Sequence, residues 1–160
     1  MKQAFLMTLA FVTGLSFAQG ADLGEKIEFS RTEAGQPAFG LTYMEAEAIW
    51  LSFSIPASAS KGRPWPAYFA FVDMNSGRML SPWMDAHLTD TPSSDYGIQQ
   101  DIVDAPVILD IMKNLKNSAI VISFRRSPPE LSPSVYLDMR EFCANHPSAV
   151  TDADGRKGCP

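Results

Sequence analysis

Alternating apolar and polar residues predict strands in the first half of the chain. Residues 27–31, Ile-Glu-Phe-Ser-Arg, change polarity at every position, the period-2 pattern of a half-buried strand, and residues 35–37 predict a turn after it. The stretch Ala48–Ile55 predicts a second strand with Trp50 on its outward face. Its core face would carry Ile49, Leu51, Phe53 and Ile55.

A hairpin is predicted around the short turn at residues 75–77. The run 67–74 is apolar, the turn contains Gly77, and residues 78–80 would form the return strand. Polar and turn-forming residues then dominate from Ser81 to Asp101, which predicts a long loop. Loops of this length are uncommon in compact domains unless they are functional or mobile.

The strongest helix signal covers Ala105 to Asn117. Asp104 precedes it as a cap, Pro106 falls in its first turn, and apolar residues recur at spacings of three and four. Residues 119–124 and 135–139 predict two further strands, and residues 140–145 a short closing helix. The fold class expected is β-rich α+β, an antiparallel sheet or sandwich with one main helix.

The N-terminal residues indicate export. Lys2 precedes an apolar run from Ala4 to Phe17, and small residues at Ser16 and Ala18 suit cleavage by a signal peptidase after Ala18. A membrane anchor would need roughly 20 apolar residues. The expected organisation is a signal peptide over 1–18, one globular domain over 19–145 and a polar tail over 146–160, in a periplasmic or secreted protein.

Two cysteines, Cys143 and Cys159, remain after cleavage. An even pair in an oxidising compartment predicts a disulfide, which would tie the polar tail back to the domain. The alternative is a zinc site that combines both cysteines with His146. It offers three ligands where structural zinc sites take four.

The net negative charge argues against nucleic acid and anionic lipid as partners. Without the leader the chain carries 12 basic and 18 acidic side chains, a formal charge of −6, and it has no basic run. Such a chain is a poor match for nucleic acid or for anionic lipid, and we expect no membrane insertion after cleavage. No motif calls for a cofactor.

Enzyme chemistry has one candidate centre. No G-x-S-x-G element is present, so a serine nucleophile of that type is not indicated. Asp85 and His87, with Asp90 and Asp95 nearby, could bind a divalent metal or transfer protons. The alternative interpretation is a solvated acidic loop.

Asp73 and Asp138 each lie within an apolar strand segment. A pair of carboxylates could act as in glycosidases, but only at a suitable separation. The alternative is that each points outward or pairs with Arg78 or Arg140 across a sheet.

A binding surface is predicted on two proline-stiffened segments. Trp65 stands between Pro64 and Pro66 and would either be presented to a partner or cover the core. The link 125–133 carries the adjacent pair Arg125 and Arg126, followed by Glu130, between two strands expected to pair. We hypothesise that Trp65, Arg125, Arg126 and Glu130 contact a partner; otherwise the link is a stiff connector.

The segment P-V-I-L-D-I-M-K-N-L-K-N-S-A-I-V-I-S-F-R-R, with V-Y-L-D-M-R-E-F after the link, gives the order helix, strand, strand, helix start over residues 105–142. In this order it resembles the C-terminal block of exported bacterial proteins of the invasion-associated locus B type. It departs from them in its proline-rich link and in the position of its cysteines. The resemblance implies a β-rich periplasmic domain of non-catalytic or unknown role, and no functional residue is transferred.

The function predicted from the sequence is that of an exported binding or inhibitor-like protein without catalytic activity. Its partner would be a protein of the envelope or extracellular space. Two alternatives stay open, namely a small metal-dependent hydrolase centred on Asp85 and His87, and a structural component of the envelope.

Overall fold

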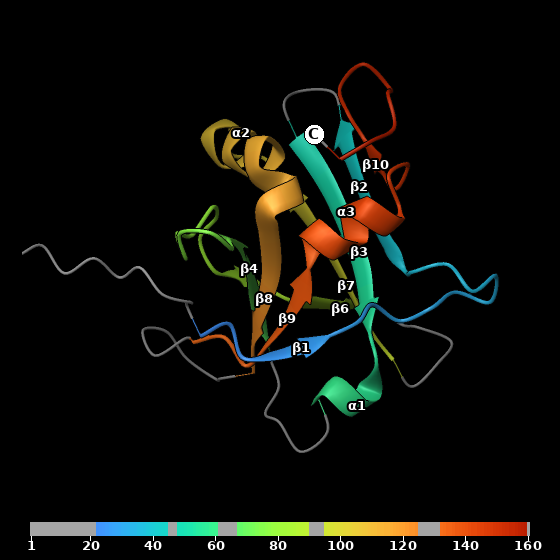
Figure 1. Cartoon of the computed structure of the whole chain (residues 1–160), viewed down its shortest axis with the longest axis vertical. Helices are drawn as coiled ribbons and strands as arrows, with labels where there is room; N and C mark the ends of the chain where they lie inside the picture. Colours follow the sequence, from blue (N-terminus) through green and yellow to red (C-terminus); the bar gives the residue numbers. More distant parts are fainter. Residues whose placement is uncertain (1–21, 45–47, 61–66, 90–94, 125–131, 160) are drawn as a thin grey trace, which may run out of the picture.

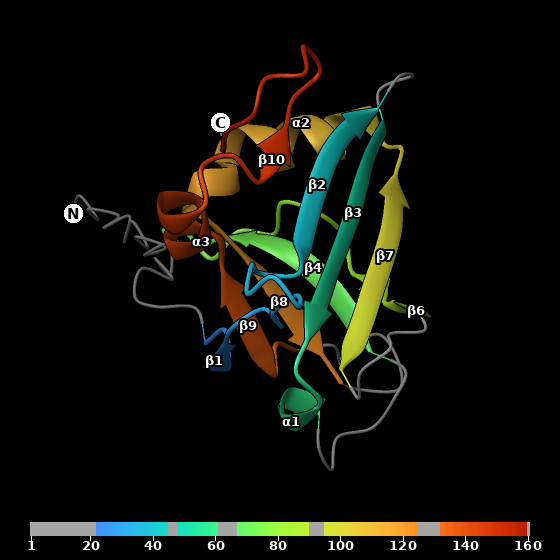
Figure 2. The same ribbon diagram turned by 90° about the vertical axis from the view of Figure 1, so that its right-hand side faces the viewer.

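The chain folds into two five-stranded β-sheets that pack face to face, with short helices at their margins (Figures 1 and 2). The structure is a computed structural model. It describes residues 22–44, 48–60, 67–89, 95–124 and 132–159. The expected signal peptide at 1–18 lies outside these residues.

The strands are β1 (Glu25–Ile27), β2 (Phe39–Met44), β3 (Ala48–Ile55), β4 (Tyr68–Asp73), β5 (Met84–Asp85), β6 (His87–Thr89), β7 (Tyr96–Ile102), β8 (Ser118–Ser123), β9 (Val135–Asp138) and β10 (Val150–Thr151). The helices are α1 (Ala57–Ser60), α2 (Ala105–Asn114), the 3₁₀ turn η1 (Leu115–Asn117) and α3 (Met139–Asn145).

The first sheet has the strand order β1-β9-β8-β4-β5, and the second has the order β10-β2-β3-β7-β6. At one edge of each sheet the pairs β1–β9 and β10–β2 are parallel, whereas the other pairs of both sheets are antiparallel. The predicted β-rich α+β class is confirmed. The pairing expected between the strands on either side of the 125–133 link is also confirmed, since β8 and β9 are neighbours.

One apolar core lies between the sheets. In β3 the four predicted core residues are buried, while Trp50 and the two serines beyond it are partly exposed. The second turn of α2 covers one end of this core with Ile108 and Ile111. Both sheets and α2 therefore contribute to a single cluster, as in other two-layer domains.

The predicted loop from Ser81 to Asp101 is wrong, because most of this segment pairs with other strands. β5 adds to the first sheet and β6 to the second, and the chain crosses between them at buried Ala86. β7 pairs with β3 over seven residues. Its exposed Gln99 and Asp101 resemble loop residues, but one face of this sheet is open to solvent and accepts them.

The other strands differ less from their predictions. The first strand ends at Ile27. Beyond it, the Ser30 N–H donates to the backbone oxygen of Ser54 in β3, and Arg31 forms an isolated bridge with Pro37. The hairpin's return strand is reduced to one bridge, between Val72 and Met79. β2 and β10 were not predicted. In the described part of the chain, no helix is long and apolar enough to cross a membrane.

Candidate functional site

A groove lies between the segment 26–31, which continues β1, and the exposed side of α3. Its first part is a cavity of about 260 Å³. A second cavity of about 320 Å³ adjoins it and extends past the C-terminal end of α3 to residues 147–149. Both cavities share Pro37, Phe142 and His146 as lining residues. We call the two together the α3 groove.

The helix presents one face to this groove. Positions 138, 141, 142, 145 and 146 line it, and residues three and four apart lie on the same side of a helix. The helix begins here because Asp138 caps it, accepting hydrogen bonds from the backbone N–H groups of Arg140 (2.9 Å) and Glu141 (3.1 Å). The cap therefore fixes which side chains face the groove.

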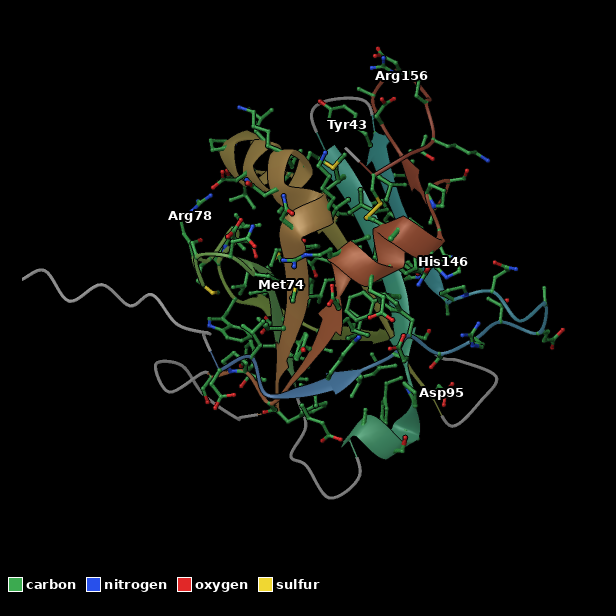
Figure 3. The ribbon with its side chains drawn as sticks, in the orientation of Figure 1. Tyr43, Met74, Arg78, Asp95, His146 and Arg156 are labelled. Carbon is green, nitrogen blue, oxygen red and sulfur yellow. A yellow bond between two sulfur atoms is a disulfide. The ribbon has the colours of Figure 1, made fainter. Side chains whose placement is uncertain are left out.

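Aromatic rings form the floor of the groove. The ring centroid of Phe142 lies 5.1 Å from that of Phe29 and 4.6 Å from that of Phe39. The ring of His146, at the end of α3 (Figure 3), lies 5.1 Å from that of Phe142. The floor is thus built of packed aromatic rings, of which Phe29 and Phe142 are buried.

The rim carries charges of both signs. Lys26 donates a hydrogen bond to Glu141 and so links β1 to α3 across 115 residues of sequence. This bond raises the pKa of Lys26 above its ordinary value, against the opposing effect of burial. Arg31 donates to the backbone oxygen of Gly35 at 2.9 Å, and Glu28 is exposed nearby. The rim therefore favours neither strongly anionic nor strongly cationic ligands.

The predicted disulfide joins Cys143 of α3 to Cys159, with their Cα atoms 5.7 Å apart. The zinc alternative is wrong, because both sulfur atoms are bonded to each other and neither is available as a thiolate. The bond anchors α3 to the C-terminal segment, whose β10 pairs with β2. The α3 wall of the groove is therefore fixed at its start by the Asp138 cap and farther along by the disulfide.

Gly24 sets the position of β1 and hence of the opposite wall. Its φ is +82°, and a Cβ at this residue would lie 2.4 Å from the backbone oxygen of Ser134. The same oxygen accepts the hydrogen bond of Glu25 N–H at 3.1 Å. Only glycine permits this close approach between residue 24 and the segment around Ser134.

We therefore expect Gly24→Ala to lower the free energy of unfolding by about 2 kcal/mol and to loosen β1, because both strain and overlap must be relieved. Chemical denaturation gives the first quantity, and amide hydrogen exchange at residues 25–29 gives the second. Gly155→Ala is the matched control, since Gly155 has φ +74° with no atom within 4 Å of the added Cβ. Equal effects of the two substitutions would show that the contact with Ser134 is unimportant.

The binding residues predicted from the sequence, Trp65, Arg125, Arg126 and Glu130, lie outside the described residues, so that surface stays a prediction. Asp85 is exposed in β5 and pairs with Tyr68, whereas the backbone of His87 belongs to the other sheet and pairs with Gln99. Within the described residues no group of three or more His, Cys, Asp or Glu could hold a metal ion. The His87 side chain and Asp90 are not among them, and the metal-dependent alternative stays a prediction.

Asp73 and Asp138 have local structural roles. Asp138 caps α3, and Asp73 accepts hydrogen bonds from the backbone N–H groups of Asn75 and Ser76 at the turn after β4. Burial alone would raise the pKa of Asp73, but these bonds and one from the Ser76 hydroxyl lower it. The expected pairing partners are also different, since Arg78 pairs with Asp110 (2.7 Å) and Arg140 donates to Asn75.

Comparisons with protein-family models, curated proteins and solved structures found no significant match to this chain. The resemblance of residues 105–142 to the invasion-associated locus B type therefore remains a prediction.

Sequence reasoning missed the α3 groove. Glu28 and Arg31 were assigned to the half-buried strand 27–31, Glu141 and Asn145 to the closing helix 140–145, and Lys26 to neither. The spacing of positions 138, 141 and 145 indicates a common helix face, but the sequence gives no sign that this face lies opposite residues 26–31.

Proposed function

We propose that the protein is an exported binding protein whose α3 groove holds an extended segment of a partner protein. The supporting observation is the groove itself, in which two adjoining cavities with an aromatic floor lie under a rim of both charges. Extended peptides are recognised in grooves of this kind, where apolar floors take side chains and polar rims bind the backbone.

The rigidity of the walls supports the same proposal. α3 is anchored by its cap, by the disulfide and by the ion pair from Lys26. A preformed groove loses less conformational entropy when a ligand binds, so a modest contact area can still give useful affinity. The disulfide is also consistent with an oxidising compartment, where such a partner would be met.

The test is affinity capture from the native envelope fraction with quantitative mass spectrometry, using variants on two sides of one helix. Asn145→Arg places a long cation in the groove and should lower recovery of the partner at least about tenfold. Ala144→Arg is the matched control, because Ala144 is exposed on α3 but does not line the groove. Its recovery should equal that of the unmodified protein.

Three other results would contradict the proposal. If Asn145→Arg and Ala144→Arg recover the same partner equally well, the groove is not the contact surface. If recovery falls only when Arg125 and Arg126 are both replaced by alanine, the 125–133 link is the surface instead. Recovery of a large assembly that neither change affects would favour the structural envelope role.

A further inference from the structure

The outer face of the second sheet carries a partly exposed tryptophan. Figure 2 looks onto this face of β2, β3 and β7, and neither α2 nor α3 crosses it. Trp50 of β3 points to this side, opposite the buried residues that alternate with it. Its cross-strand neighbours are Thr42 on β2 and Asp101 on β7, both exposed.

The indole of Trp50 extends along the sheet toward β2. Gly40 lies diagonally across from Trp50, and a Cβ built on Gly40 would lie 3.9 Å from Cζ3 of the ring. At this distance the ring lies in van der Waals range of the Gly40 position on β2. The tryptophan therefore forms part of the sheet surface and retains partial exposure to solvent.

Beside this ring lies a cavity of about 300 Å³, lined by Trp50, Gln99, Gln100 and Asp101. Gln99 and Asp101 are exposed and supply an amide and a carboxylate. The hydroxyl-bearing residue Ser52 pairs with Gln99 in the register of the two strands. An aromatic ring bordered by hydrogen-bonding groups of both kinds, donors and acceptors, is thus open on this face.

From this arrangement we propose a second binding site, which takes one ring of a neutral saccharide. The apolar C–H face of a pyranose fits against an indole, and its hydroxyl groups can bond to the amide and the carboxylate. A purely apolar partner would bury Gln99 and Asp101 without hydrogen bonds. None of the four lining residues is cationic, so an anionic ligand would meet only the Asp101 carboxylate.

The experiment is binding of the full chain to an array of neutral pyranose oligosaccharides, followed by calorimetry on those retained. We expect retention of at least one neutral glycan, with little change at about 0.5 M NaCl because no ion pair is involved. Trp50→Ala should weaken binding at least about tenfold through loss of the stacking surface. Gln99→Ala should weaken it about threefold or more, and this exposed residue can be replaced without loss of the fold.

The controls separate this site from other tryptophans and other ligands. Trp83→Phe should leave glycan binding unchanged, because Trp83 packs on the first sheet against Ala70, Val72 and Val121. Absence of binding to every neutral glycan at about 10 mM overturns the proposal, as does binding that neither Trp50→Ala nor Gln99→Ala weakens. Binding of choline alone, lost in Asp101→Asn and in high salt, would instead identify an organic-cation site.

Discussion

Replacing Phe142 by alanine is expected to lower the free energy of unfolding by about 3–5 kcal/mol and to abolish capture of the partner protein. The side chain is 6 % exposed and contacts the rings of Phe29, Phe39 and His146. Its removal leaves a cavity in the core and takes away the middle of the groove floor. Chemical denaturation and affinity capture measure the two effects separately.

Phe53→Ala is the control that separates stability from binding. Phe53 is 1 % exposed and packs edge-on against Phe29 and Phe69, at centroid distances of 6.0 and 5.8 Å, but it does not line the groove. We expect a similar loss of about 3–5 kcal/mol with capture retained wherever the variant is folded. Loss of capture in both folded variants would mean that Phe142 acts through general stability, and the groove would lose its support as the binding site.

The double substitution Cys143→Ser with Cys159→Ser is expected to lower the free energy of unfolding by about 3 kcal/mol. The disulfide closes a separation of 16 residues, and a loop of this size restricts the unfolded chain by about that amount. In the folded protein, hydrogen exchange should increase over residues 146–159, where β10 pairs with β2 over two residues only. α3 should persist, because its Asp138 cap and its buried Met139 and Phe142 do not depend on the bond.

A reducing agent gives the same test without mutation. Reduction should lower the unfolding midpoint of the unmodified protein and leave that of the double variant unchanged. If reduction has no effect on the unmodified protein, the bond does not contribute to stability. Capture of the partner by the double variant should weaken as well, since the disulfide holds one wall of the groove.

The local pattern of apolar and polar residues was sufficient to predict an element where each of its residues is clearly either buried or exposed. In β3 the alternation of large apolar residues with Trp50 and serines allowed one orientation only, and the strand was predicted at its observed bounds. The helix over 105–117 was likewise predictable, because the Asp104 cap, an early proline and apolar spacing all agree, although its last turn is 3₁₀.

Pattern failed where pairing, rather than propensity, decides the structure. Residues 96–102 contain a glycine, two glutamines and an aspartate. They form a strand because they pair with β3 over seven residues. β10 is two residues long and depends on β2, which the disulfide brings within reach. Such short or polar strands are stabilised by their neighbours, which a local window of sequence does not contain.

The groove was unpredictable for a related reason. Lys26 and Glu141 are 115 residues apart, and they meet because β1 pairs in parallel with β9, directly before α3. The first strand was expected at 27–31, with no partner assigned. Unless the pairing of β1 with β9 is known, the sequence predicts neither the ion pair nor the position of residues 26–31 opposite α3.

The β-rich class, the main helix, the pairing of β8 with β9 and the disulfide were all predictable, because each depends on local patterning or on a single possible partner. Tertiary structure alone decided the crossing between sheets at Ala86, the parallel edge pairs, the α3 groove and the open face around Trp50. These features arise where segments distant in sequence come together. The hydrophobic effect favours burial of the apolar faces, but it is non-directional, and the strand pairing then sets which polar residues meet.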